Sequence, residues 1–496
     1  MKLNMNIKNT GIALMLVGAL ASCKTDLDIN VDPNNPTLTT AQPNLILPSA
    51  LQTTANIYNR NLVGDNNFRF ASIWMGHAGF SGNYFIGQET NNYTLTTQFG
   101  EGTWTNCYDN NADYDLVQKL GKSKVIPFYE GIGKVMKAYN FQTLVDLYNN
   151  VPYSEALQGA VVPTPKYDNG KDVYEGILKD VEDGIALINS ATPGTVGNDD
   201  IMFKGDKVKW AQFANTVKLR MLLRQSERSE RSAYITSKIA TIQTPAGATS
   251  PYLTADATIN PGYLDSDGKQ NGFWRSCHTP TGTYNQDLTR GGAYVINVLK
   301  ANIDPRLSRL FKPLANGTYV GCQLGAANPA NSGSSEFGLG LLKNSVQNSL
   351  LITVAESYFL QAEAVVRGWI SGDAKALYTA GVNASFNYLG ATGADTYMAQ
   401  IGNKNTNWDA TTSTTERIAL IIRQKYIALT ATHSLESYND YRRLGLPSDV
   451  SLSPVAGSNK IPNRLMFPQR EYNVNGTQVL TQGTINPQVD KIWWMK

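Results

Sequence analysis

The strongest constraint on the fold is a helical spacing of apolar residues that recurs in paired blocks along the chain. In residues 125–148 apolar side chains recur mostly three or four positions apart, and residues 172–189 repeat this spacing as one stripe. The sequence therefore predicts four helical hairpins and an all-α fold. The further paired blocks are residues 207–227 with 229–242, 348–368 with 373–389, and 414–430 with 434–444.

The turns between these blocks are short and contain small residues. The segment "LQAEAVVRGWISGDAKALYTAGV" places Ala and Gly where neighbouring helices would touch. Tetratricopeptide-type repeats stack helix on helix in this way, although their strict signature is absent here. No linker-like change in composition divides the chain after its N-terminal part, so we expect one domain over residues 43–496, built as an α–α superhelix.

Two long segments lack the helical spacing. Residues 61–123 and 245–345 are rich in Gly, Pro, Asn, Thr and Ser. Segments of this length are too long to be simple loops in a compact domain. We therefore expect them to form an irregular layer that carries the function.

The N-terminus has the pattern of an export signal. Lys2 and Lys8 precede a short apolar run over residues 11–21, about half the length that spans a bilayer. The sequence Leu-Ala-Ser-Cys that ends at Cys23 resembles the bacterial lipobox, in which the cysteine is acylated, for example with palmitate, before cleavage. We expect a signal peptide at residues 1–22 and a lipidated tether at residues 23–42. The alternative is an ordinary signal peptide that ends near a cysteine by chance.

Charge and cysteine content exclude several classes of function. The formal net charge is only +3, and no Lys/Arg cluster is present, which argues against nucleic acid as a partner. The cysteines after the lipobox and the histidines are widely spaced, so we expect no zinc site, no metal and no cofactor, although one cysteine pair could bridge. These residues are Cys107, Cys277, Cys322, His77, His278 and His433.

One pair of glutamates deserves consideration as a catalytic pair. Glu356 and Glu363 share a face of a predicted helix, but two helical turns separate them by about 10 Å along the axis. Glycosidase carboxylates lie roughly 5 to 9 Å apart. Glu363 also precedes Arg367 by four positions, an ordinary helix ion pair. We therefore predict a structural role for both and no enzymatic activity.

Aromatic residues are the better guide to a binding site, because they make a tenth of the chain. An exposed ring can stack on a sugar while short polar side chains bind its hydroxyls. We predict the ligand-binding residues from the two irregular segments; the alternative is that the rings fill the core. The candidates are Trp74, Phe80, Asn83, Tyr84 and Tyr93 in the first segment and Tyr263, Trp274 and Arg275 in the second, with Asn92, Asp265, Asn271 and Phe273 as neighbours.

Six blocks resemble, in order, segments of the SusD/RagB family of outer-membrane nutrient-binding lipoproteins. The resemblance runs from Cys23 to the end of the chain. The blocks are "YNFQTLVDLYNNVPYSEAL", "WAQFANTVKLRMLLR", "VAESYFLQAEAVVRGWISGDAKALYTAGVNASF", "IRQKYIAL", "LESYNDYRRLGLP" and "NRLMFPQREYNVN". The resemblance implies four tetratricopeptide-like units, an irregular ligand-binding face, and exposure on the cell exterior. It also implies a TonB-dependent, SusC-like transporter as partner, to which the protein delivers glycans or peptides.

Three hypotheses for the function follow. A nutrient-binding lipoprotein explains the lipobox, the hairpins and the aromatic segments together, with oligosaccharides as ligand or, alternatively, oligopeptides. A helical-repeat scaffold without a small ligand explains only the hairpins. A secreted glycosidase explains the aromatic residues but has no suitable acid pair. We favour the first hypothesis.

Overall fold

The computed structural model describes residues 41–60, 62–84, 87–455, 457 and 460–496. The expected signal peptide, Cys23 and nearly all of the expected tether lie outside the described residues. Residues 43–496 cluster as one unit, and the following description concerns that unit.

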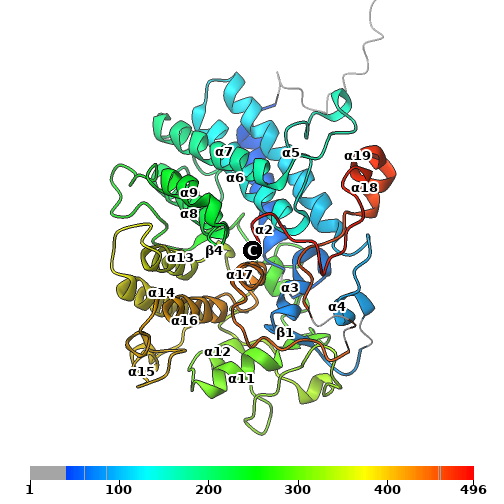
Figure 1. Cartoon of the computed structure of the whole chain (residues 1–496), viewed down its shortest axis with the longest axis vertical. Helices are drawn as coiled ribbons and strands as arrows, with labels where there is room; N and C mark the ends of the chain where they lie inside the picture. Colours follow the sequence, from blue (N-terminus) through cyan, green and yellow to red (C-terminus); the bar gives the residue numbers. More distant parts are fainter. Residues whose placement is uncertain (1–40, 61, 85–86, 456, 458–459) are drawn as a thin grey trace, which may run out of the picture. The chain divides into compact units, whose positions relative to one another are not determined.

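A first group of long helices packs side by side in the order of the chain (Figure 1). α6 lies between α5 and α7, α7 also packs on α8, and α2 packs on α5. The bounds are α2 (Pro43–Tyr58), α5 (Glu101–Ser123), α6 (Pro127–Tyr148), α7 (Gly170–Ser190), α8 (Lys207–Arg224) and the short α9 (Ser232–Ile239).

A second group continues the array. α13 packs on α8, α14 and α16, and α17 contacts α16, α8 and α3. The bounds are α13 (Val354–Val366), α14 (Ala374–Leu389), α16 (Thr414–Ala428), α17 (Ser434–Leu444) and, before α17, α3 (Arg69–Trp74). The fold is therefore a superhelix of paired helices, which confirms the predicted all-α class.

The helix ends follow from local side chains. Asn169 caps α7 by accepting a hydrogen bond from the backbone N–H of Lys171, and Asp206 caps α8 in the same way. At the start of α16, Ser413 and Glu416 form a reciprocal capping box. These caps satisfy backbone donors that have no partner inside the helix.

Glycines allow α6 and α7 to approach closely. A Cβ on Gly131 would lie 2.8 Å from the carbonyl oxygen of Gly184, and a Cβ on Gly184 would lie 2.7 Å from Cγ2 of Val135. A larger residue at either position would push the helices apart. The close approach of α6 to α7 therefore depends on these two residues.

Two expectations about local structure are wrong. The C-terminal part of the segment 61–123 is not irregular, because α5 occupies it. The buried Asn110 side chain accepts hydrogen bonds from the side chains of Asn140 and Thr54 and donates one to the carbonyl of Ala50. These tertiary contacts support a helix that is rich in polar residues. The block that was expected to start a helix at 348 begins instead with the strand β4 (Ser349–Ile352).

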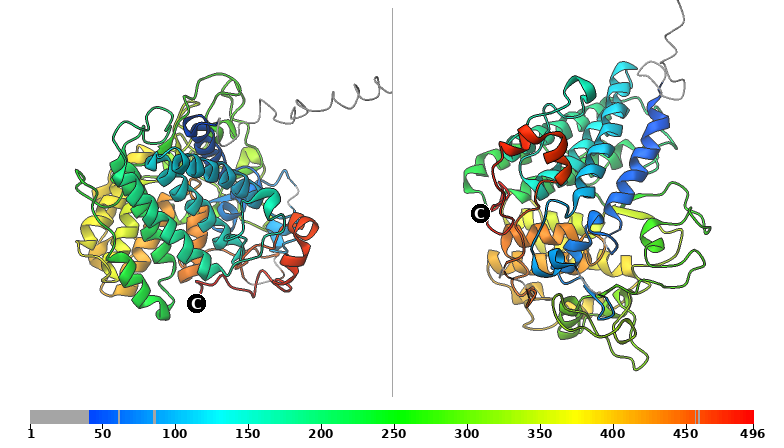
Figure 2. Two further views of the ribbon diagram at one scale, coloured as in Figure 1. Left: turned by 90° about the horizontal axis from the view of Figure 1, so that it is seen from above. Right: turned by 90° about the vertical axis from the view of Figure 1, so that its right-hand side faces the viewer.

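The remaining described residues of the two segments, 62–84, 87–100 and 245–345, are named here the loop layer; part of it is drawn in green beside the helices (Figure 2). Two small antiparallel sheets fasten it. β1 (Ala78–Phe80) pairs with β3 (Thr289–Gly291), so that Gly79 faces Arg290, and β2 (Ala257–Ile259) pairs with β4. Besides α3, its short helices are α4 (Gln88–Asn92), α10 (Gly272–Arg275), α11 (Ala293–Ala301) and α12 (Leu307–Leu310). The short helices α15 (Ala394–Met398), α18 (Gln469–Val474) and α19 (Gly476–Leu480) lie outside it.

A cluster of buried charges, named here the central ion cluster, joins the two helix groups. It balances five basic against five acidic side chains, and every member except Arg442 forms an ion pair with another member. α6, α8, α13, α16 and α17 all contribute. The members are Asp146, Arg220, Arg224, Glu356, Glu363, Lys425, Glu436, Asp440, Arg442 and Arg443.

Candidate ligand-binding site

The loop layer contains a hollow of about 360 Å³, named here the Tyr84 pocket. Among the large apolar residues that line it, Phe80 and Leu324 are buried, whereas Tyr84 exposes 43% of its surface. An exposed ring beside a hollow suits stacking against a flat ligand surface. The pocket is lined by Phe80, Ser81, Gly82, Tyr84, Asn91 and the segment 323–328.

Close backbone contacts build this pocket. The N–H of Gly82 donates to the carbonyl of Pro329 at 2.8 Å, and the Asn328 side chain donates to the carbonyl of Phe80 at 3.0 Å. A Cβ on Gly82 would lie 2.1 Å from the carbonyl oxygen of Asn328. Only glycine fits there, so the two walls of the pocket are held together by main-chain contacts.

A second hollow of about 490 Å³, named here the charged pocket, lies beside it. Asn83, next to Tyr84, accepts a hydrogen bond from the backbone N–H of Asn331, which lines the second hollow. The two pockets have no lining residue in common, and this hydrogen bond links the chain segments that border them. The charged pocket is lined by Asp287, Arg290, Lys312, the segment 313–315, Asn331, Ser332, Ser334 and Glu336.

A third hollow of about 370 Å³ shares Lys312, Pro313 and Glu336 with the charged pocket. Tyr284, Phe311 and Phe337 give it an aromatic lining. The charged pocket and the third hollow therefore adjoin each other in the loop layer.

Three aromatic candidates of the first segment are buried, which corrects the prediction that they present open rings. Trp74 and Tyr93 are 1% and 0% exposed, and their rings pack edge to face with centroids 6.0 Å apart. Phe80 is also buried, although it lines the floor of the Tyr84 pocket. The structure therefore leaves Tyr84 and Asn83 as the accessible candidates of this segment.

The candidates of the second segment contact other residues of the protein: Trp274 and Arg275 contact His278, and Tyr263 contacts Ser349. Trp274 is buried and stacks on His278 with ring centroids 4.4 Å apart. Tyr263 shares a hydrogen bond with the Ser349 hydroxyl, and burial raises its pKa. Arg275 donates to the carbonyl of His278 at 2.5 Å and keeps 38% of its side chain exposed. Of the three, Arg275 alone is substantially accessible.

Sequence reasoning missed the charged pocket. Its charged residues, Asp287, Arg290, Lys312 and Glu336, are scattered over fifty positions and belong to no motif. The antiparallel pairing of β1 with β3, together with the return of the chain near residue 336, brings them together. No local signal in the sequence announces that pairing.

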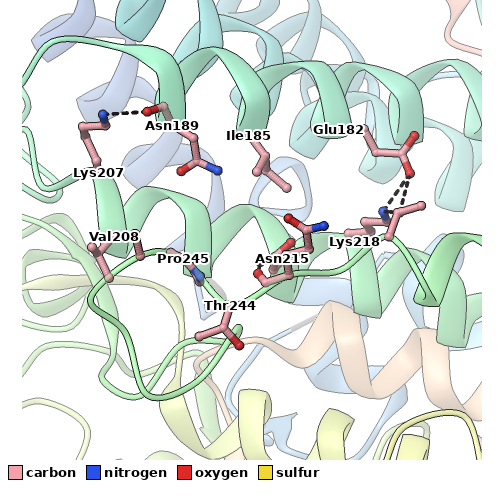
Figure 3. Close-up of a pocket in the computed structure, with 12 residues that line it drawn as sticks. Glu182, Ile185, Asn189, Lys207, Val208, Asn215, Lys218, Thr244 and Pro245 are labelled. Carbon is pink, nitrogen blue, oxygen red and sulfur yellow. Dashed lines mark hydrogen bonds and ion pairs between the residues drawn. The ribbon is translucent and has the colours of Figure 1, made fainter.

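A larger hollow, of about 800 Å³, lies between α7, α8 and the loop after α9 (Figure 3). Its charged groups are already paired: Lys218 donates to Glu182 at 2.7 Å, and Lys207 donates to the carbonyl of Asn189 at 2.8 Å. It has no aromatic lining residue. These features favour the loop layer as the binding surface.

The acidic pair considered for catalysis belongs to the central ion cluster. Glu363 accepts hydrogen bonds from Arg443 and Arg367, and Glu356 pairs with Arg220 at 3.5 Å. Burial raises the pKa of Glu356, and both side chains are at most 1% exposed. A substrate cannot reach carboxylates that are enclosed in this way, so their predicted structural role agrees with their surroundings.

The thiols and histidines are also engaged in packing. Cys107, Cys277 and Cys322 are free and buried. His77 lies between the Ser434 hydroxyl and the carbonyl of Tyr426, and burial lowers its pKa to about 3.

Within the described part of the chain, no helix is long and apolar enough to cross a membrane.

The superhelix of paired helices, with its hollowed loop layer, places the protein among the α-helical superhelix folds. Residues 33–468 match the SusD-like family, which is described as "Starch-binding associating with outer membrane", and the chain belongs to this family. The resemblance drawn from the six sequence blocks is thereby confirmed. The family consists of outer-membrane proteins that bind nutrients or glycans. No curated protein sequence matches the chain.

Solved structures of similar proteins support the fold. A SusD homologue from Bacteroides fragilis has 23% identity and a TM-score of 0.73, over 92% of this chain and 99% of that one. A chitin-binding SusD homologue from Flavobacterium johnsoniae has 21% identity and a TM-score of 0.74, over 90% and 98%. A SusD-like protein from Bacteroides thetaiotaomicron has 21% identity and a TM-score of 0.73 over the same shares.

Proposed function

We propose that this protein is a lipid-anchored outer-membrane protein that captures oligosaccharides at the Tyr84 pocket and delivers them to a TonB-dependent transporter. The family description supports glycan binding at the outer membrane, and one similar structure is that of a chitin-binding protein. The observation that carries the proposal is the exposed Tyr84 ring beside a hollow lined by Gln, Asn and Ser side chains. The anchor is Cys23 and the protein faces the cell exterior.

The protein acts by binding and not by catalysis. Its function requires capture and release of a ligand, for which a shallow, open site on the loop layer is suitable. The SusC-like transporter would carry the ligand across the membrane. A stable assembly of the two proteins would need to bury roughly 2,000 Å² of accessible surface in their interface. Oligopeptides are the alternative ligand, since an open tyrosine ring can also contact peptide side chains.

Substitution of Tyr84 tests the proposal. Removal of a stacking ring costs about 1 to 3 kcal/mol of binding, so Tyr84→Ala should weaken the affinity for a neutral oligosaccharide about ten- to a hundredfold. Tyr84→Phe, the matched control, keeps the ring and should keep most of the affinity. Isothermal titration calorimetry with maltohexaose, chitohexaose and oligopeptides measures this. Equal binding by wild type and Tyr84→Ala would contradict the assigned site, and binding of peptides alone would contradict the assigned ligand.

A further inference from the structure

One end of the helical array carries two exposed apolar side chains beside lysines. Val125, in the turn between α5 and α6, exposes 86% of its surface, and Leu45, in the first turn of α2, exposes 72%. Lys124 directly precedes Val125, and the exposed Lys122 lies three positions before it. Neither lysine forms an ion pair with another described residue. This end therefore offers both apolar surface and uncompensated positive charge.

Hydrogen bonds place the start of α2 beside this turn. The hydroxyl groups of Thr54 in α2 and Tyr114 in α5 are 2.6 Å apart, and the side chain of Asn66, beyond the end of α2, accepts from the backbone N–H of Gly102 at the start of α5 at 3.0 Å. The two helices therefore run antiparallel, and α2 begins where α5 ends (Figure 2). The two exposed apolar side chains consequently lie at the same end of the unit.

Val125 has an unfavourable backbone conformation. Its φ is 57°, in the left-handed region, where a β-branched residue is an outlier. The turn is fixed, because the N–H of Val125 donates to the carbonyl of Lys122 at 3.2 Å and the N–H of Ile126 donates to the carbonyl of Gly121 at 2.8 Å. Ile126 packs against the core, whereas Val125 faces solvent. Strain of this kind is concentrated at functional positions, so the valine side chain indicates a contact outside the protein body.

The position of this end in the chain indicates its partner. Residues 23–42 directly precede α2 and reach at most about 70 Å when fully extended, so an acylated Cys23 would keep the start of α2 near the membrane. Lysines attract the phosphates of anionic lipids, and apolar side chains enter the boundary between headgroups and acyl chains. The two kinds of side chain at this end match these two layers.

We propose that the end formed by Leu45, Lys122, Lys124 and Val125 contacts the anionic headgroups of the membrane that carries the lipid anchor, and thereby orients the protein on that membrane. This inference rests on the anchor of the proposed function. A contact of four side chains is weak by itself, but the anchor raises its effective concentration. The contact therefore sets the orientation of the protein and does not replace the anchor.

Vesicle binding of the Cys23→Ala protein tests the inference, because only the surface contact is then left. The vesicles contain phosphatidylcholine alone or an equimolar mixture with phosphatidylglycerol, at millimolar lipid, and sedimentation measures the partitioning. We expect at least about fivefold stronger partitioning into the mixed vesicles. Lys122→Ala combined with Lys124→Ala should remove most of this difference, since each lysine near an anionic surface contributes about fivefold in affinity. The control Lys269→Ala, which removes an exposed lysine of the loop layer, should leave partitioning unchanged.

Val125→Gly separates the contact from folding. Glycine adopts a positive φ without strain, so this variant should be at least as stable as its parent, while its partitioning into mixed vesicles falls about three- to tenfold. Ile303→Gly is the matched control. Ile303 also has a positive φ, of 49°, and exposes 82% of its surface. It lies between α11 and α12, at the opposite end of the unit from the start of α2 (Figure 1), so its replacement should not change partitioning.

The outcomes decide this inference separately from the proposed function. Equal partitioning into neutral and mixed vesicles, or no binding to either, overturns the inference, as does undiminished binding of the double lysine variant or of Val125→Gly. If Val125→Gly fails to fold, the double lysine variant decides alone. The assay uses protein without an acyl group, so its result does not depend on acylation of Cys23. Failure of the proposed function appears instead in membrane fractionation of the anchored protein and in glycan calorimetry.

Discussion

Trp74 is an aromatic residue that supports the loop layer by packing inside it. Its ring stacks on Phe99 with centroids 5.9 Å apart and planes inclined by 13°, and it meets Tyr438 edge to face at 5.6 Å. Its indole N–H donates to the carbonyl of Thr90 at 3.2 Å. The side chain is therefore enclosed by other rings and contributes to the stability of the loop layer, while Tyr84 remains open to a ligand.

This difference in burial predicts opposite effects for two aromatic substitutions. Trp74→Ala should lower the free energy of unfolding by about 3 to 5 kcal/mol because it leaves a cavity. Tyr84→Ala should lower it by less than about 1 kcal/mol, because the ring is exposed. Chemical denaturation of the two variants measures both values. A Trp74→Ala protein that unfolds like wild type but has lost glycan affinity would show that the ring contacts ligand.

Residue type alone could not separate these two rings. Trp74 and Tyr84 both lie in a polar, glycine-rich segment, so the sequence alone does not show which of the two rings is open. The burial of Trp74 depends on Tyr438, which lies more than 360 positions away. Arg290 was missed for the same physical reason, since its partners Asp287 and Glu336 meet it only after the chain has folded.

At the scale of elements, the central ion cluster connects α13 to α17. Arg443 donates to Oε1 of Glu363 at 2.5 Å and to Oε2 at 2.8 Å, and Arg367 adds a further hydrogen bond at 2.8 Å. Burial alone would raise the pKa of Glu363, but the two arginines outweigh it and lower the pKa from 4.5 to about 2. The carboxylate is therefore ionised in the folded protein even in moderately acidic solution.

This shift predicts a loss of stability in acid. The folded-state pKa of Glu363 lies below its unfolded value, so its contribution is fully present above about pH 4.5 and is lost as the pH falls towards about 2. The shift of the pKa corresponds to about 3 kcal/mol of stability. Glu363→Gln should therefore destabilise the protein by about 3 kcal/mol at pH 7, and it should lose less stability than wild type when the pH is lowered. Urea denaturation at pH 7 and pH 3 measures this. Glu230→Gln is a surface control, and its free energy of unfolding should change with pH as that of wild type does. If Glu363→Gln and wild type lost equal stability in acid, Glu363 would not be the source of the acid sensitivity.

The elements that the sequence predicted are those whose signal is local. α7 has a regular apolar stripe and an Asn cap, so periodicity alone identifies it. α5 contains Asn110 and Asn111, which favour turns in isolation and are stabilised here by hydrogen bonds to Thr54 and Asn140. β4 was missed because its four residues are all buried, and a short apolar run fits a helix or a strand equally well.

At the scale of the whole molecule, the proposed binding site and the expected anchor lie in separate parts of the chain. The Tyr84 pocket is built from residues after position 61, whereas the expected anchor is Cys23, which lies outside the described residues. The segment between them, residues 24–42, is rich in Asp, Asn, Thr and Pro, a composition that buries little apolar surface. We therefore expect that removal of the anchor leaves both folding and glycan binding intact.

Cys23→Ala tests this separation. Each buried CH₂ of an acyl chain contributes roughly 0.8 kcal/mol, and two or more chains hold a protein on a membrane stably, so loss of the acylated cysteine should move the protein from the membrane fraction to the soluble fraction. Fractionation followed by immunoblotting measures the shift, and calorimetry of the released protein should give wild-type glycan affinity. Ser22→Ala, which keeps a small residue beside the cysteine, is the matched control and should stay in the membrane fraction. Retention of Cys23→Ala in the membrane fraction would show that another part of the chain provides the anchor.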